Sequence, residues 1–285
     1  MGVTQSRAVA AGGIAGLVGI AGLAPLDPAA AAGLLTHRAV YDLSLAETSQ
    51  AAGLSGVEGR MVYEFTGGAC EGYSVAFRFV IRVLDASGGG RVTDLQTTSF
   101  ETPDASAFQF LSKTFVNRKL TEETRGRAER EADDGIRLAL QKPTEREETL
   151  PGEALFPTQH MRAILNSAEA GETILIADVF DGSESGDKIY ETTSVIGPRR
   201  EGAGEPGDEA DDAVAKIGSD AHWPVTIAYF DPQSDTEGER TPAYQLGFLL
   251  YENGVSRRLL LDYGDFELRG RLSELTPIDP VPCPE

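Results

Sequence analysis

The residues whose side chains could perform catalysis or hold a metal are few and scattered along the chain. The three histidines, His37, His160 and His222, lie far from one another, so no pair has the spacing of a zinc site. No serine has the flanking glycines of a nucleophile elbow. The 45 acidic residues are so numerous that a chance pair near a cleft is expected. We therefore predict no catalytic residue, metal ligand or cofactor, and a surface or packing role for His160 and His222.

Two further stretches match known ligand-binding motifs in their spacing, but the residues around them do not fit those motifs. The glycines at 202, 204 and 207 match a dinucleotide-binding fingerprint, but acidic residues surround them and no helix follows to hold a pyrophosphate. The segment Asp181–Asp187 resembles the start of a calcium-binding EF-hand loop, but Thr192 stands where a bidentate glutamate is required and the flanks resemble strands. We interpret the first as a chance match and the second as a hairpin turn.

The N-terminal residues have the parts of a secretory signal peptide. Arg7 precedes an apolar run from Ala8 to Ala24, two prolines follow it, and residues 29–32 are alanines suited to cleavage. A membrane anchor is the alternative, but the run is short, glycine-rich and interrupted, whereas a span needs about 20 apolar residues. We predict that residues 1–32 are a signal peptide and that the mature protein lies in the periplasm, with no stable membrane span.

Export changes the expected chemistry of the two cysteines, Cys70 and Cys283. Two cysteines cannot form a zinc site unaided. In an oxidising compartment, two lone cysteines are more often paired than free. We predict a disulfide between them. The alternative is two free thiols, one of them reserved for a partner.

The charge of the chain limits its partners. There are 45 acidic and 25 basic residues among 285, which gives a formal net charge of −20. Binding to nucleic acid requires a basic face, so we exclude nucleic acid as a partner. Direct binding to anionic lipid headgroups is disfavoured for the same reason.

Alternating apolar and polar residues dominate the sequence and predict strands. From Tyr73 to Leu84 one face is apolar and the other carries arginines, which is typical of an antiparallel strand buried on one side. Asn253-Gly254, between two apolar stretches, predicts a hairpin with a type I′ turn. The other predicted strands are Ala39–Ala46, Arg60–Thr66, Arg91–Glu101, Phe108–Asn117, Leu120–Arg130, Ile136–Lys142, Thr173–Phe180, Lys188–Ile196, Pro224–Phe230, Ala243–Tyr251, Val255–Tyr263 and Phe266–Leu272. The pattern predicts a mainly β fold: a meander, a sandwich or a barrel-like sheet.

One main helix is predicted, over Thr158–Ala170. Phe156-Pro157-Thr158 offers an N-cap and Gly171 can end the helix. Its apolar stripe should pack on a sheet face or fill one end of a curved sheet; it consists of Met161, Ile164, Leu165 and Ala168.

The acidic stretch Glu201–Asp212 has few apolar residues and many like charges. It predicts a mobile surface loop rather than a linker between domains. We therefore expect residues 33–285 to form a single domain.

Seven short strings occur in one order along nearly the whole mature chain, from about His37 to Cys283. They are Cys70-Glu71-Gly72-Tyr73, Phe156-Pro157-Thr158-Gln159-His160, Phe180-Asp181-Gly182-Ser183, Trp223-Pro224-Val225, Leu250-Tyr251-Glu252-Asn253-Gly254, Leu261-Asp262-Tyr263-Gly264-Asp265-Phe266 and Pro282-Cys283. Together they make the chain similar to the cell-envelope integrity EipB family, formerly a family of unknown function. The resemblance implies a periplasmic protein with a curved β-spiral, or incomplete barrel, and one disulfide between its two cysteines. The family has no established catalytic residues to carry over.

The resemblance also implies a role in maintaining the cell envelope of a Gram-negative bacterium under stress. We predict a non-catalytic periplasmic protein, not an enzyme, that binds or scaffolds an envelope component, with a periplasmic protein, a lipid or a lipoprotein as partner. The alternative is a carrier or sensor that holds a lipid or lipoprotein in the concave sheet. A hydrolase of cell wall or lipid is third, because the sequence shows no suitable group of residues. The sequence does not indicate an oligomeric state.

Overall fold

The structure of the protein is a computed structural model. The structure describes residues 33–280, except for 50–52, 86, 88, 132–134, 203–206, 220 and 233–239, together with Cys283. The predicted signal peptide, residues 1–32, lies outside the described residues. Within the described residues, neither helix is long and apolar enough to cross a membrane.

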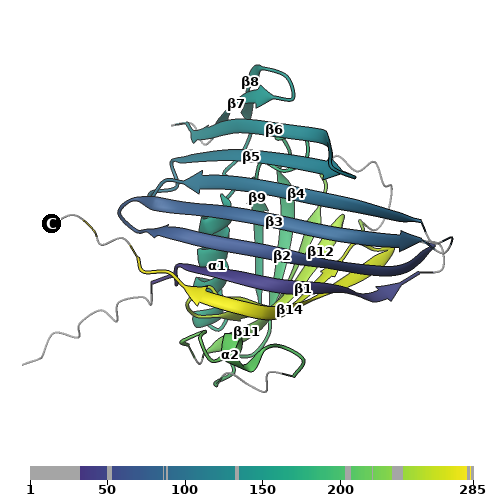
Figure 1. Ribbon diagram of the computed structural model, residues 1–285. Coiled ribbons are helices and arrows are strands. Elements are labelled where there is room, and N and C mark those ends of the chain that lie inside the picture. Colours follow the sequence, from purple (N-terminus) through teal and green to yellow (C-terminus); the bar gives the residue numbers. More distant parts are fainter. Residues whose placement is uncertain are drawn as a thin grey trace, which may run out of the picture. The chain divides into compact units, whose positions relative to one another are not determined.

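The described residues form one antiparallel sheet of fourteen strands (Figure 1). Consecutive strands pair from β1 to β8 and from β9 to β14, and β1 pairs with β14 in the interior of the sheet. The strands are β1 (His37–Thr48), β2 (Leu54–Gly68), β3 (Gly72–Asp85), β4 (Gly90–Glu101), β5 (Ala107–Val116), β6 (Lys119–Arg130), β7 (Ile136–Lys142), β8 (Arg146–Leu150), β9 (Ile174–Val179), β10 (Tyr190–Ile196), β11 (His222–Phe230), β12 (Tyr244–Tyr251), β13 (Ser256–Asp262) and β14 (Phe266–Pro277). The first and last strands of the chain therefore lie side by side.

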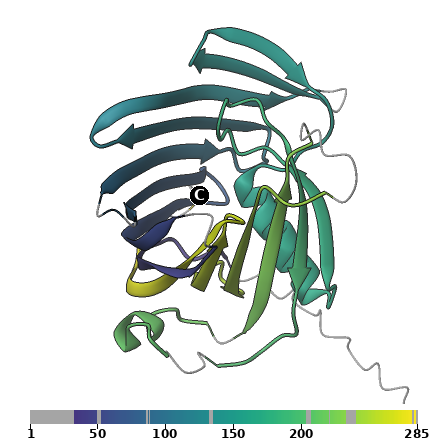
Figure 2. The same cartoon turned by 90° about the vertical axis from the view of Figure 1, so that its right-hand side faces the viewer.

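The sheet is strongly curved and does not close. Figure 2 shows its two halves facing each other, with helix α1 (Pro157–Glu169) on the concave side between them. At the edge strand β9, Leu155 forms a parallel bridge: its N–H donates to Asp178 O (2.7 Å) and its O accepts from Phe180 N (2.9 Å). Register shifts in the pairing of β1 with β14 help the sheet to bend. The predicted fold, one curved many-stranded sheet with one main helix, is confirmed.

The structure has a strand, β8, that the alternation did not reveal. Its sequence, Arg-Glu-Glu-Thr-Leu, has only one apolar residue, Leu150, which is buried. As an edge strand it pairs only with β7. A charged edge strand is expected where unpaired backbone must not attract another chain.

The predicted type I′ turn at Asn253-Gly254 is wrong in detail. Only Gly254 has a positive φ, at 85°. Gly254 N donates to Tyr251 O (2.8 Å) and Tyr251 N to Val255 O (2.9 Å), as in a three-residue loop that ends in a left-handed glycine. The Asn253 side chain is buried and donates to Ile217 O (2.7 Å), which holds Asn253 in place.

Helix α1 begins and ends one residue earlier than predicted, and its N-cap lies within the predicted string Phe156-Pro157-Thr158. The cap residue is Phe156, which makes no side-chain capping hydrogen bond, and Pro157 opens the helix. Instead, the buried carboxylate of Glu101, at the end of β4, accepts from the N–H groups of Thr158 (2.8 Å) and Gln159 (3.0 Å). A residue far away in the sequence therefore satisfies the free N–H groups of the helix and fixes its first turn. Burial raises the pKa of Glu101.

In the second half of the acidic stretch Glu201–Asp212, the structure differs from the predicted mobile loop. Residues 203–206 lie outside the described part, but Glu209 is buried and helix α2 (Asp211–Val214) follows it. The carboxylate of Glu209 pairs with the Arg257 guanidinium at 2.6 Å, and the two side chains are 0% and 1% exposed. It also accepts from the N–H groups of Arg258 (3.0 Å) and Leu272 (3.1 Å). One glutamate in an acidic run thus joins the segment to β13 and β14.

Candidate functional site

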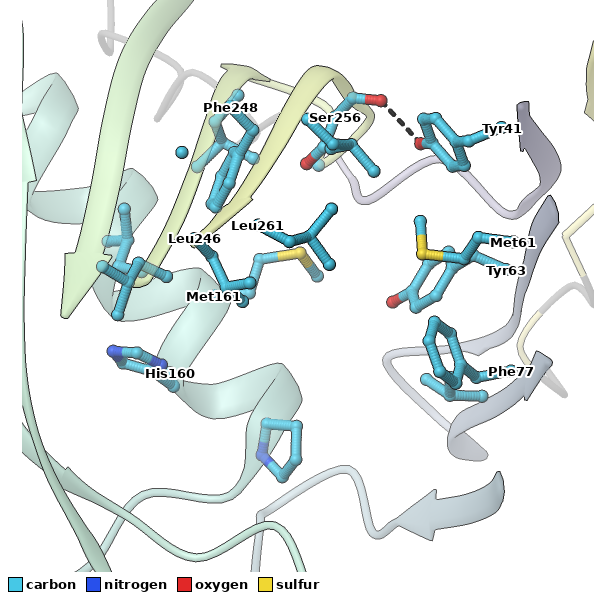
Figure 3. Close-up of a pocket in the computed structure, with 18 of the residues that line it drawn as sticks. Tyr41, Met61, Tyr63, Phe77, His160, Met161, Leu246, Phe248, Ser256 and Leu261 are labelled. Atoms are coloured by element: carbon cyan, nitrogen blue, oxygen red, sulfur yellow. Dashed lines mark hydrogen bonds between the residues drawn. The ribbon is translucent and has the colours of Figure 1, made fainter. Parts of the chain in front are cut away.

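A pocket of about 310 Å³ lies on the concave side of the sheet, under α1 (Figure 3). One wall comes from the inner faces of β1 to β3, the opposite wall from β11 to β13, and the third from the first turns of α1. The labelled residues in Figure 3 are Tyr41, Met61, Tyr63, Phe77, Leu246, Phe248, Ser256 and Leu261 from the strands and His160 and Met161 from the helix. The size is at the lower end of the range of about 300–1,000 Å³ that is usual for ligand sites.

Strand register brings the wall residues together. Tyr41 on β1 is opposite Met61 on β2, and Tyr63 is opposite Phe77 on β3, so these four side chains share one face. On the other wall, Leu246 on β12 is opposite Leu261 on β13. These residues have the period-two spacing that predicts strands, and that spacing puts them all on the inner face.

The pocket is apolar and carries no formal charge. No Asp, Glu, Lys or Arg is among the described residues that line it. Tyr41 OH donates to Ser256 O at 2.6 Å, so part of the polar surface is satisfied within the protein. Burial raises the pKa of Tyr63, whose hydroxyl Figure 3 shows directed into the pocket. The walls therefore offer apolar contact and a few neutral polar groups.

His160 lies at the pocket wall and is a weak base. It is 4% exposed, and burial lowers its pKa to about 4, so the imidazole is neutral at neutral pH. Its Nε2 lies 3.4 Å from Thr192 Oγ1, which itself donates to Ala177 O at 2.7 Å. The Thr192 hydroxyl proton is therefore already engaged, and the imidazole can only act as the donor to that oxygen.

The other two histidines are also buried. His37 lines the same pocket, donates from Nδ1 to Leu35 O (2.7 Å), and has a pKa lowered by burial. His222 stacks on Tyr251, with ring centroids 4.8 Å apart. The structure thus brings His37 and His160 to one pocket, where they serve as neutral wall residues. The predicted packing role of His160 and His222 agrees with this burial, and a surface role does not.

The segment Asp181–Asp187 forms the loop between the paired strands β9 and β10, as predicted for a hairpin. Its acidic side chains bind groups of the protein itself. Asp181 accepts from Ser183 N (2.9 Å), Glu184 accepts from Tyr190 OH (2.6 Å), and Asp187 pairs with Arg146. Across the described residues, no group of three or more His, Cys, Asp or Glu side chains could hold a metal ion.

The two cysteines are joined in the structure. Cys70, in the turn between β2 and β3, forms a disulfide with Cys283, beyond the end of β14, and their Cα atoms are 5.6 Å apart. The bond links the C-terminal tail to a turn two strands away from β14, since the order is β14-β1-β2-β3. It lies outside the set of residues that line the pocket.

Sequence reasoning did not identify the pocket residues as a group. The strand pattern marked one apolar face, that of Tyr73–Leu84 in β3, and located the strands that became β2 and β12, but it does not tell which inward faces oppose each other. Met61 and Met161 were a weak signal: two of the chain's three methionines come together in the pocket.

Comparison with known proteins places these features in a family. A family described as EipB-like matches residues 28–279. The cell envelope integrity protein EipB of Brucella abortus (strain 2308) is 45% identical over 251 residues, which are 88% of this chain and 87% of that protein. A crystal structure from Brucella abortus, described as a beta-barrel-like protein of domain of unknown function DUF1849, is similar with a TM-score of 0.79 and 44% identity. The structural match covers 87% of this chain and 100% of the chain in that crystal structure.

Proposed function

Because the chain belongs to the EipB-like family, we propose that it is a non-catalytic periplasmic protein that maintains the integrity of the cell envelope. The observation that carries this proposal is the relative named for cell envelope integrity, which is 45% identical over 88% of the chain. The family match covers residues 28–279, which include both halves of the sheet and α1, so it supports a shared mode of action and not only a shared segment.

The periplasm is the location that suits the chain best. The N-terminal residues have the anatomy of a signal peptide, and the Cys70–Cys283 disulfide requires an oxidising compartment to form and persist.

Binding, rather than catalysis, is the activity that the site supports. The one titratable group of α1 at the pocket, His160, is a weak base because burial lowers its pKa to about 4, and its Nε2 can only donate to the Thr192 hydroxyl. A hydrolase needs a base that can accept a proton from water or from a nucleophile. An apolar wall with few polar groups instead suits a ligand held by burial of its own apolar surface.

Two modes of binding follow from the architecture. In the first, the protein is a scaffold that holds an envelope protein on its surface. In the second, it is a carrier or sensor that holds a lipid or the acyl chain of a lipoprotein in the concave sheet. The second mode is favoured by one specific observation, the apolar pocket of about 310 Å³ between the two halves of the sheet.

Deletion of the gene in its own host tests the proposal. We expect the deletion strain to lose resistance to detergents that damage the envelope, and the full chain to restore it. A chain that lacks residues 1–32 should remain inside the cell and fail to restore resistance. A deletion strain as resistant as its parent would contradict the proposal. A folded His160→Ala protein that fails to restore resistance would instead favour an enzyme.

A further inference from the structure

We propose that the pocket under α1 binds one acyl chain, to a depth of about twelve carbon atoms, and leaves the head group of the lipid outside. This inference rests on the proposed function, in which the protein holds an envelope component, and it names the chemical class of that component. It concerns the pocket alone and does not depend on which lipid or lipoprotein supplies the chain.

The lining excludes other classes of ligand by their polarity. A peptide would bring N–H and C=O groups that each need a partner, and a sugar would bring several hydroxyls. The pocket has no charged side chain among its described lining residues, and two of its polar groups, the Tyr41 hydroxyl and the His37 Nδ1, are bonded within the protein. An acyl chain has no hydrogen-bonding groups, so its burial leaves no polar group of the ligand unsatisfied.

The same absence of charge places the head group outside. A phosphate or carboxylate in the pocket would meet no Lys or Arg of the lining, and the two histidines, His37 and His160, are kept neutral by burial. An unpaired ion in an apolar site is strongly unfavourable. The chain therefore enters from its methyl end.

The volume limits how much of the chain enters. An apolar cavity of about 150 Å³ accepts benzene, which corresponds to about 25 Å³ per carbon atom. On that scale, the 310 Å³ of this pocket accept about twelve carbon atoms. This is one chain and not the two or three chains of a whole lipid.

The pocket can also adjust to a flexible occupant. Met61 on β2 and Met161 on α1 extend toward each other from two different walls in Figure 3. Methionine has three rotatable bonds and fills irregular gaps with little strain. The two side chains can therefore move apart for a chain and pack against its methylene groups.

A chain-length series tests the inference. Protein purified from the periplasm is titrated calorimetrically with fatty acids of 8, 10, 12, 14 and 16 carbons, each below its micelle concentration. Because each buried methylene strengthens binding by about fourfold, we expect the affinity to rise by about that factor per carbon up to about twelve, and then to level off. No binding, or a steady rise through sixteen carbons, would overturn the inference.

Ligands that share one chain but differ in head group test whether the head group stays outside the pocket. Dodecanoic acid, a monododecanoyl phospholipid and a dodecanoyl lipopeptide should bind with affinities within about threefold of one another, because only the chain enters. A requirement for one head group would contradict its exclusion. Mass spectrometry of lipids retained after gentle purification then shows whether a phospholipid or a lipoprotein supplies the chain.

Pocket-filling variants provide the structural control. Leu246→Trp on β12 and Val75→Phe on β3 fill the pocket from opposite walls, and each should weaken dodecanoic acid binding at least tenfold. Ile176→Trp, on the outer face of β9 where the side chain is 74% exposed, is the matched control and should bind normally. Circular dichroism identifies any variant that does not fold. If one pocket variant does not fold, binding is measured with the variant on the opposite wall. Normal binding by a folded pocket variant would overturn the inference.

Different results would contradict the acyl-chain inference and the proposed function. If the wild-type chain restores envelope resistance but binds no fatty acid, the acyl-chain inference is wrong and the proposed function stands. If it binds fatty acids as expected but the deletion strain shows no envelope defect, the pocket assignment stands and the proposed function is wrong.

Discussion

Removal of the disulfide should destabilise the protein strongly while leaving its fold intact. The C-terminal tail is already held at Ile278, whose N–H donates to Thr36 O (2.8 Å) and whose O accepts from Thr36 Oγ1 (2.5 Å). Loss of the bond between Cys70 and Cys283 therefore frees only the last residues of the native state. Its main effect is on the unfolded chain, where the bond closes a loop across 213 positions.

The size of the effect follows from that loop. The loop-closure relation gives about 5 kcal/mol for 213 positions, and removal of native disulfides typically costs about 2–5 kcal/mol. In a chain of this size, each 1 kcal/mol changes the melting temperature by about 2–4 °C. We therefore expect the Cys70→Ser, Cys283→Ser and double variants to melt about 5–20 °C below the wild type, by similar amounts.

Thermal melting followed by circular dichroism, with and without reductant, measures this effect. Reductant should lower the melting temperature of the wild type to that of the double variant, and the double variant, as the control, should not respond. Near-ultraviolet spectra of all three variants should match the wild type at low temperature. Two thiols that react with a labelling reagent in denatured, non-reduced protein from the periplasm would contradict the disulfide and the expected loss of stability.

Three other substitutions test the buried polar groups, each by denaturant unfolding. Glu209→Gln removes the charge of the buried carboxylate that pairs with Arg257 and should lower the free energy of unfolding by about 3–5 kcal/mol. The exposed control Glu201→Gln should lower it by less than about 0.5 kcal/mol, and equal effects would contradict a stabilising role of the buried pair. Glu101→Gln weakens the two hydrogen bonds that the side chain accepts from the start of α1 and should lower the free energy of unfolding by about 1–3 kcal/mol. An unchanged free energy of unfolding would show that the carboxylate is not needed there. His160 resists protonation in the folded state down to about pH 4 but accepts a proton near pH 6.5 when unfolded, so stability falls as the pH drops through this window. Between pH 7.5 and 5, the free energy of unfolding of the wild type should fall by about 2 kcal/mol more than that of His160→Gln. Parallel pH profiles of the two proteins would contradict the lowered pKa of His160.

The strands could be predicted from the sequence because each follows from local chemistry. The alternation from Tyr73 to Leu84 became β3 with the apolar face inward. Where the alternation is absent, as in the charged edge strand β8, the prediction missed the element. The turn at Asn253-Gly254 was located correctly, but its type depends on the bond from Asn253 to Ile217, which is 36 positions away in the sequence.

Two buried polar contacts and the pocket could not be predicted from the sequence, because each depends on contacts between distant segments. Glu209 has acidic neighbours on the chain, and only the fold shows that it pairs with Arg257. Glu101 lies at the end of an ordinary strand, and nothing nearby in the sequence shows that it caps a helix more than fifty residues later. The inner faces of β2 and β12 oppose each other only because the sheet curls.

The most direct test of the account is whether the pocket is needed in the cell. The deletion strain is given either the Leu246→Trp chain or the Ile176→Trp chain, and immunoblots confirm equal amounts in the periplasm. The two variants carry the same new side chain, one in the pocket and one on the exposed outer face. We predict that Ile176→Trp restores detergent resistance to the wild-type level and that Leu246→Trp does not. Full resistance with the folded Leu246→Trp chain would contradict the claim that the protein acts by binding through this pocket.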